Sequence, residues 1–248
     1  MPPNRAKALP GAIGVEADPL GAFCTAAAIV RAKRGQQFSL LVGQRRSVYV
    51  VRKGLLVLQA EISGKRRQLL NLFYPKDIVR SSCVPPLPEA SLVAAVVSEI
   101  WRVPTSSFEA LANSDASLRR SLSHQLAHQH SRANLHIAAI GNLTSEERLA
   151  SFLIEMALRI GVAGPDGIAF QIPLSRSDIA DYLAINADTL SRVMSRFRAR
   201  GIVFQTRRGR TLLPDGRMLR DLSPIADAVV ALHGSEASKR DPCVFMLA

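Results

Sequence analysis

Three patterns are missing from this 248-residue chain, and each absence excludes a class of protein. No apolar run approaches the roughly 20 residues of a membrane-spanning helix, and the first 34 residues lack the apolar core of a signal peptide. The cysteines, Cys24, Cys83 and Cys243, are odd in number and far apart, which fits neither a disulfide framework nor a CxxC metal site. Because no histidine precedes His124, a barrel in the first half lacks the imidazoles of a cupin-like metalloenzyme. We therefore expect a cytoplasmic protein that is not an enzyme, holds no metal or cofactor and does not enter the membrane.

The charge balance points to a polyanionic partner. Lysine and arginine number 32 against 20 acidic residues, which gives a net charge of +12 and an isoelectric point of about 10.6. Nucleic acid fits this balance, and an anionic membrane surface is the weaker alternative. With 48% hydrophobic and 21% charged residues, the chain is composed to fold, and its length suggests two domains.

Short β-rich runs separated by glycines occupy the chain from Val30 to Val103. Strands about ten residues apart predict a sandwich, a jelly roll or a barrel. Ser63-Gly64-Lys65-Arg66 between two of the runs predicts a hairpin. The runs cover residues 38–42, 47–51, 55–59, 69–73 and 92–97.

From Pro104 to Asn142 the pattern becomes helical, with one row of positions three or four residues apart. This spacing is close to a heptad seam, so we expect the helix to pair with a second copy of itself. The expected dimer interface comprises Leu118, Leu122, Leu126, Gln129, Ala133, His136 and Ile140. His124 and His128, at i and i+4, could hold a metal only with further ligands.

The stretch from Leu174 to Gly201 predicts two short helices joined by a tight turn. Ser175 and Asp178 form a capping-box-like start for the first helix. In the second helix the apolar residues recur at helical spacing, so the opposite face is exposed and polar. The residues expected to contact DNA bases from that face are Asp188, Ser191, Arg192 and Ser195.

Basic residues surround this stretch. Residues 202–205 and 211–213 read as two strands that flank a basic tip, which predicts a wing. Thr144 and Glu147 form a capping box that starts a preceding helix, and Ser223-Pro224 can start a last one. The arginines expected to contact DNA phosphates are Arg176, Arg196, Arg198, Arg207, Arg208 and Arg210.

Together these motifs resemble the CRP/FNR-type bacterial transcription regulators from about Ala32 to Leu222. The stretches that carry the resemblance are Val48–Gly54, Gly64–Gln68, Tyr74–Ile78 and, most specifically, Asp188-Thr189-Leu190-Ser191-Arg192. The resemblance implies an α+β fold with a cyclic-nucleotide-binding-type β-roll (jelly roll), a long dimerisation helix and a C-terminal winged helix-turn-helix. It also implies a homodimer that binds double-stranded DNA and acts on RNA polymerase.

The corresponding division of the chain is a flexible lead (1–20), a sensor roll (21–103), a dimerisation helix (104–142), a DNA-binding domain (143–222) and a short helix with a tail (223–248). The family carries glutamate where this chain has Asp188. That carboxylate could accept a hydrogen bond from cytosine N4, hold Arg192, or simply favour the helix N-terminus.

The sensor motifs of the family are incomplete here. Lys76 and Asp77 stand where cyclic-nucleotide binders carry glycine and glutamate, and Pro85-Pro86-Leu87-Pro88-Glu89 replaces the arginine and serine of the phosphate cassette. We therefore expect that cAMP is not bound, unless Arg80 substitutes. An iron-sulfur centre needs a cysteine cluster that Cys24 alone does not supply.

The signal that controls the regulator is left open by these motifs. Cys83 is a possible redox-reactive thiol, or else an inert half-buried cysteine. The sequence thus predicts a regulator of an inverted-repeat operator that responds to a redox or other non-cAMP signal, or is controlled by its abundance. The alternatives are a nonspecific architectural DNA-binding protein and a cyclic-nucleotide-responsive regulator.

Overall fold

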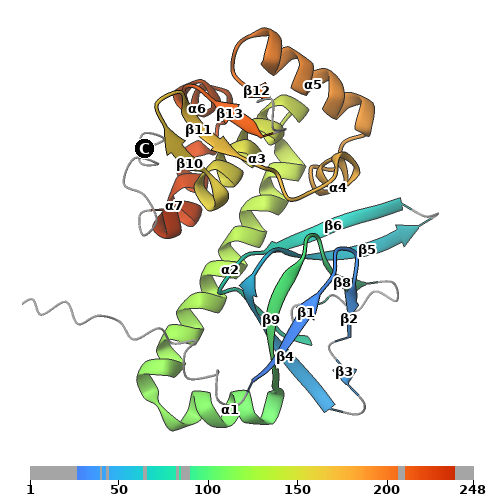
Figure 1. Ribbon diagram of the computed structural model, residues 1–248, viewed down its shortest axis with the longest axis vertical. Helices are drawn as coiled ribbons and strands as arrows, with labels where there is room; N and C mark the ends of the chain where they lie inside the picture. The colour runs from blue at the N-terminus through green and yellow to red at the C-terminus, as the bar shows by residue number, and fades with distance from the viewer. Residues whose placement is uncertain are drawn as a thin grey trace, which may run out of the picture.

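The computed structural model describes residues 27–39, 41–42, 45–63, 66–81, 84, 90–205 and 210–237. Figure 1 shows a β-roll, a long helix that runs along it, and a second domain of helices and strands at the far end of that helix. The expected N-terminal lead, the three cysteines, the Pro85–Glu89 segment, Arg207, Arg208 and the tail after residue 237 lie outside the described residues.

Two antiparallel sheets form the β-roll. One has the order β1-β9-β4-β3 with β7 paired to β4, and the other has the order β2-β8-β5-β6. The runs expected at 47–51, 55–59 and 69–73 are confirmed as strands, whereas 38–42 is divided between two strands and 92–97 ends at Ala94. The strands are β1 (Ala28–Ala32), β2 (Gln37–Phe38), β3 (Leu41–Val42), β4 (Arg45–Lys53), β5 (Leu56–Ser63), β6 (Arg66–Phe73), β7 (Ile78–Val79), β8 (Ser91–Ala94) and β9 (Ser98–Pro104).

The sheet that contains β5 and β6 is buried on both faces. The predicted hairpin is present, since Ser63 pairs with Arg66. In β5 the side chains alternate, so that Leu56 and Leu58 enter the interior of the roll while Val57 packs against the C-terminal domain. Burial on both faces explains the continuous apolar run in this strand.

The helix expected over 104–142 is two helices, α1 (Thr105–Ser114) and α2 (Ala116–Asn142). Asp115 causes the break. Its backbone is extended, and its side chain accepts hydrogen bonds from the backbone N–H groups of Ser117 (2.7 Å) and Leu118 (3.3 Å). An aspartate that satisfies free N–H groups in this way starts a new helix.

The assignment of the 118–140 row to a dimer interface is wrong for its N-terminal members. Leu118 and Leu122 are 7% and 4% exposed and belong to the core between α2 and the roll, and Leu126 packs against that core. Gln129 is buried and exchanges two hydrogen bonds with the backbone of Ile78 in β7.

The C-terminal members of the row also lie against their own chain. His136 and Ile140 line a cavity at the junction of the domains, and Ala133 is half-buried. The heptad-like spacing is real, but the row contacts the chain's own roll and C-terminal domain.

A buried ion pair joins α2 to the roll. The Arg132 guanidinium lies 2.5 Å from the carboxylate of Asp77, and both side chains are almost fully buried. Asp77 also accepts hydrogen bonds from the Tyr74 backbone N–H (2.8 Å) and the Gln125 amide (3.3 Å). These bonds compensate for removing the carboxylate from water.

The C-terminal domain combines helices with a four-stranded sheet of order β10-β11-β13-β12. The wing strands are confirmed, because Phe204 pairs with Leu212 and Gln205 with Thr211. The domain comprises α3 (Ser145–Ile160), β10 (Val162–Gly164), β11 (Gly167–Phe170), α4 (Arg176–Tyr182), α5 (Ala187–Ala199), β12 (Phe204–Gln205), β13 (Thr211–Leu213), α6 (Arg217–Leu222) and α7 (Ala226–Ala237).

We predict that Asp77→Asn lowers the free energy of unfolding by about 3 kcal/mol or more, because it leaves the buried Arg132 charge without its partner. Urea denaturation followed by circular dichroism measures this change. Glu99→Gln is the matched control, since Glu99 pairs with the exposed Arg31 and Arg52, and such pairs contribute about 1 kcal/mol or less. A loss for Asp77→Asn as small as that of the control would contradict the prediction.

Candidate DNA interface

A capping box starts α4, as the sequence predicts. The Ser175 hydroxyl accepts a hydrogen bond from the Asp178 N–H, and the Asp178 carboxylate accepts one from the Ser175 N–H, both at 3.1 Å. Ile179 and Tyr182 of this short helix are buried against the rest of the domain. The cap therefore fixes the start of a helix whose opposite end packs into the core.

A tight turn joins α4 to α5. Ala184 adopts a left-handed backbone conformation with φ of 52°, and the Ile185 N–H donates to the carbonyl of Ala180. Asn186 then caps α5 by accepting a hydrogen bond from the Thr189 N–H at 2.7 Å. Arg200 ends the helix and Gly201, with φ of 70°, continues the chain, which confirms the predicted stop.

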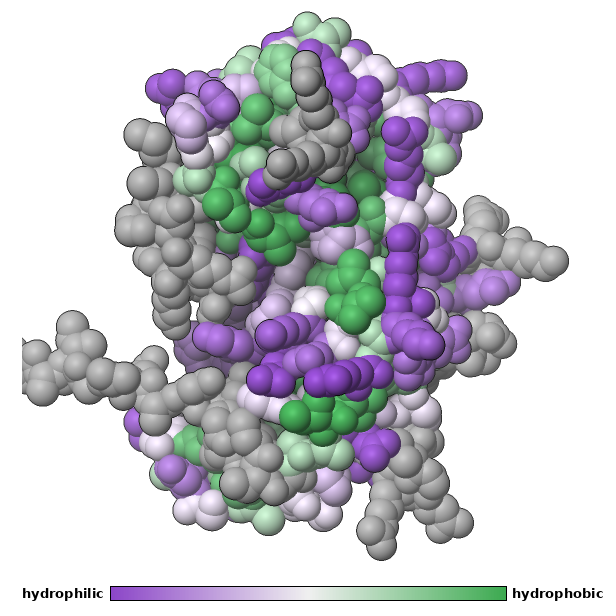
Figure 2. Space-filling view, viewed as in Figure 1, coloured by the Kyte–Doolittle hydropathy of each residue, from purple (hydrophilic) through white to green (hydrophobic). Residues whose placement is uncertain are grey.

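The two faces of α5 differ in burial as the sequence predicts. Leu190, Val193 and Phe197 are at most 3% exposed. The opposite face is exposed and bears all four predicted base-contacting residues, Asp188, Ser191, Arg192 and Ser195. Figure 2 shows hydrophilic side chains projecting from the molecule along α5. The arrangement leaves these side chains free to enter a groove of DNA, and base contact itself stays a prediction.

The predicted phosphate-contacting arginines fall into three environments. Arg176 and Arg198 are exposed. Arg196 lies 3.4 Å from the carboxylate of Glu146. Arg210 donates a hydrogen bond to the Ala169 carbonyl, which engages its side chain with the sheet. Glu146 also binds Arg200 at 2.6 Å, an ion pair that the sequence patterns do not reveal.

The roll holds the first helix of the helix-turn-helix directly. Arg67 of β6 forms ion pairs with Asp178 (2.7 Å) and Asp181 (2.6 Å) of α4. The neighbouring Gln68 amide donates to the Asp181 carbonyl. Burial raises the pKa of Asp178, but hydrogen bonds from Ser175 and Arg67 outweigh it and lower this pKa overall. The carboxylate therefore stays ionised and paired with Arg67 at neutral pH.

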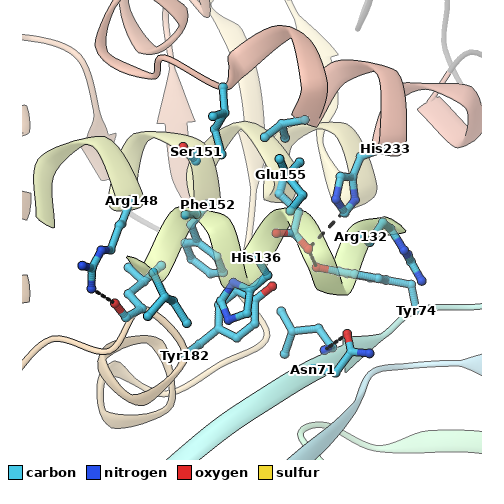
Figure 3. A pocket seen from close by; sticks show the side chains of 17 residues that line it. Asn71, Tyr74, Arg132, His136, Arg148, Ser151, Phe152, Glu155, Tyr182 and His233 are labelled. Atoms are coloured by element: carbon cyan, nitrogen blue, oxygen red, sulfur yellow. Dashed lines mark hydrogen bonds and ion pairs between the residues drawn. The ribbon is translucent and has the colours of Figure 1, made fainter. Parts of the chain in front are cut away.

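A cluster of buried polar side chains fills the junction between the roll, α2 and the C-terminal domain (Figure 3). The Tyr74 hydroxyl donates to Glu155, and Arg159 donates to the His233 ring at 2.9 Å. The His136 ring stacks on the Tyr182 ring, with centroids 3.9 Å apart and planes within 8°. A cavity of about 40 Å³ remains between these groups.

Burial dominates the titration of this cluster. It raises the pKa of the Glu155 carboxyl and, with the nearby Glu155 charge, raises the pKa values of Tyr74 and Tyr182 well above their usual range. Burial, followed by the charge of Arg148, lowers the pKa of His136 to about 4. The pKa of His233 is lowered well below its usual range by burial and by Arg159. Both imidazoles are therefore neutral at pH 7.

Sequence patterns did not identify this cluster. The available signal was Glu155 and Arg159, at i and i+4 within the mostly apolar part of α3 that begins at Leu149. Charged residues on a buried helix face indicate paired partners elsewhere in the chain. Those partners come from Tyr74, just after β6, and from α2, α4 and α7, which no local pattern connects.

The positions that resemble a cyclic-nucleotide cassette have structural roles. Asp77 is 2% exposed, and its carboxylate forms an ion pair with Arg132 and accepts a hydrogen bond from Gln125. Lys76 has a left-handed backbone with φ of 78°, the conformation that favours the glycine found there in cyclic-nucleotide binders. Arg80, the proposed substitute, lies 3.4 Å from Glu109.

The residues covered by the structure contain no group of three or more histidine, cysteine, aspartate and glutamate side chains arranged for a metal ion. The rings of His124 and His128 do stack, with centroids 6.4 Å apart. Over the same part of the chain, no helix is both long and apolar enough to cross a membrane.

Comparisons with known proteins agree with this geometry. The family model described as the Crp-like helix-turn-helix domain matches residues 147–222. The transcriptional regulatory protein btr of Bordetella pertussis is 29% identical over 175 residues, which cover 70% of this chain and 72% of that protein. The transcriptional activator protein FnrA of Stutzerimonas stutzeri is 28% identical over 158 residues, 63% of this chain and 65% of that protein.

Solved structures extend the similarity to the whole fold. The structure of FixK2 from Bradyrhizobium japonicum has a TM-score of 0.67 at 28% identity, and the match covers 79% of this chain and 97% of that one. A CooA mutant from Carboxydothermus hydrogenoformans shares the fold, with a TM-score of 0.66 at 19% identity over 79% of this chain and 88% of that one.

These similarities define a DNA-binding transcription regulator with a β-roll and a winged helix-turn-helix. The domain match, the relatives and the structural neighbours together support a regulator of CRP/FNR type. The fold class expected from the sequence is confirmed.

We predict that His136→Phe flattens the pH dependence of stability between pH 6.5 and pH 4. The unfolded histidine takes up a proton near pH 6.5, whereas folded His136 stays neutral until about pH 4. The unfolded state therefore binds more protons in this window, so stability falls as the pH falls, by up to about 3 kcal/mol from this group. Phenylalanine keeps the stack on Tyr182 without titrating.

Urea denaturation at intervals between pH 7 and pH 4 measures the two slopes. His124→Phe, at an exposed position of the same helix, is the control and should keep the wild-type slope. Equal slopes for His136→Phe and wild type would show that His136 is not the titrating group.

Proposed function

We propose that this protein is a homodimeric, sequence-specific transcription regulator of an inverted-repeat operator. The observation that carries the proposal is the polar face of α5, which exposes Asp188, Ser191, Arg192 and Ser195 together in a capped helix-turn-helix. A helix of this kind fits the major groove, where each base pair presents a distinct pattern of hydrogen-bonding groups.

The side chains on this face contact different groups of the DNA. Arg192 bonds the O6 and N7 atoms of a guanine, a contact worth about 1 to 3 kcal/mol of discrimination. Ser191 and Ser195 bond neighbouring base edges or phosphates, and Asp188 accepts from a cytosine amino group. The phosphate contacts come from Arg176, Arg196 and Arg198, with Arg207, Arg208 and Arg210 of the wing.

A second row on α2 supports dimerisation. Seven positions spaced alternately three and four residues apart are all exposed, and Ile137 among them is an apolar side chain with 66% exposure. A helix pair formed along such a row would place two α5 helices in successive major grooves about 34 Å apart. The row comprises Arg120, Ser123, Ala127, His130, Asn134, Ile137 and Gly141.

The signal to which the regulator responds is not a cyclic nucleotide in this proposal. Asp77 supports this view, because its carboxylate is buried and is already paired with Arg132. Control comes from a redox or other signal, with Cys83 as the candidate thiol, or from the abundance of the protein. The sensor roll (21–103) and the dimerisation helix (104–142) would set the spacing of two DNA-binding domains (143–222) that act on RNA polymerase at a promoter.

Selection of bound sequences from a random DNA pool tests the function, and we expect an inverted repeat with half-sites one helical turn apart. Arg192→Ala should then abolish the preference at one guanine position and leave nonspecific binding nearly intact. Binding is measured by fluorescence anisotropy at fixed salt, on the selected site and on random DNA. An equal loss on both would place Arg192 on a phosphate.

The affinity ratio between the selected site and random DNA separates the two DNA-binding functions. A specific regulator keeps a ratio of about 10³ or more. A pool that yields no preferred sequence would favour the nonspecific architectural protein instead.

Ile137→Glu should convert the dimer to a monomer, because it replaces the large apolar side chain of the exposed row with a charged one. Sedimentation velocity measures the mass in solution. Val162→Glu is the control, since Val162 is 58% exposed and lies away from α2, and it should leave the dimer intact. A dimer that survives Ile137→Glu would exclude this face of α2 as the interface.

A further inference from the structure

A groove separates α5 from the wing sheet. Its volume is about 200 Å³, five times that of the junction cavity, which is about 40 Å³. Apolar side chains of three helices form its floor, among them Phe152 of α3, Ile179 of α4 and Met194 of α5. Polar side chains stand at its rim, including Ser191 and Gln205.

The charge of the groove is of one sign. Arg176 and Arg198 line it, and among the lining residues that the structure describes there is no aspartate or glutamate. Neither arginine has an ion pair within the described part of the chain, whereas the adjacent Arg196 and Arg200 both bind Glu146. Two uncompensated guanidinium groups beside an apolar floor favour a ligand that is both apolar and anionic.

We propose that this groove binds a small organic carboxylate with a compact apolar body, such as a single aromatic ring. The volume sets the size, because a cavity of about 150 Å³ accommodates benzene. The ring would lie on Ile179 and Met194, and the carboxylate would accept hydrogen bonds from Arg198 and Arg176. Ser191 and Gln205 are within the same lining and can bond further polar substituents.

Such a ligand would control DNA binding from within the DNA-binding domain. It would occupy Arg176, Arg198 and Ser191, three of the residues assigned above to DNA, so ligand and DNA would compete. This consequence rests on the proposed function, whereas binding of the ligand to the groove does not.

The test uses benzoate and the full-length protein without DNA. Isothermal titration calorimetry should show saturable binding of benzoate, and the methyl resonance of Met194 should shift in a carbon-13 methionine spectrum. Benzyl alcohol lacks the charge and inorganic phosphate lacks the apolar body, so each should bind at least tenfold more weakly.

Two variants on the same helix locate the site. Arg198→Gln should weaken benzoate binding at least tenfold. Arg200→Gln, which removes an exposed arginine outside the groove, should leave benzoate binding unchanged. The proposal is overturned if benzoate does not bind, if phosphate binds equally well, or if both variants behave alike.

A titration of the protein with operator DNA, with and without benzoate, tests the groove proposal separately from the proposed regulatory function. Benzoate should lower the affinity for the selected operator. Benzoate binding without any effect on operator affinity would overturn the competition. Benzoate binding by a protein that prefers no DNA sequence would leave the groove in place and remove the proposed function.

Discussion

The ion pair between Arg132 and Asp77 determines how the long helix lies on the roll. Two opposite charges withdrawn from water are stable only when their geometry is good and their other hydrogen bonds are satisfied. Asp77 meets this condition through Tyr74 and Gln125. Nε and Nη1 of Arg132 have no hydrogen-bond partner among the described residues, so the guanidinium depends on Asp77 and on the Tyr74 ring, 5.7 Å away, and this dependence favours one position of α2 along the roll. That position decides which face of α2 is buried and which face is exposed.

The roll and the DNA-binding domain are joined by packing as well as by the helix. Val57 and Leu72 of the roll share a core with α3, Arg67 binds two carboxylates of α4, and Tyr74 bonds Glu155. Close-packed junctions of this kind shift between discrete arrangements and do not deform gradually. A displacement of the roll would therefore reach α4, the helix that precedes α5, directly.

Sequence patterns correctly predicted the features that depend on residues close together in the chain. The caps at Thr144 and Ser175 and the apolar period of α5 each involve residues within one or two helical turns, and all are present in the structure. The orientation of α2 could not be predicted in this way, because Leu118 and Ile137 both lie on rows of heptad-like spacing and only the position of the roll distinguishes them. The junction cluster was missed for the same reason.

Glu146 places an internal counter-ion beside α5, the helix proposed to read DNA. Arg196 and Arg200 are already neutralised by this carboxylate, so moving either to a phosphate exchanges one anion for another. Salt dependence of DNA binding reflects the counter-ions released when phosphates are newly neutralised. The affinity should accordingly fall less steeply with salt than the number of arginines around α5 suggests, and a larger share of it should come from contacts that depend on sequence.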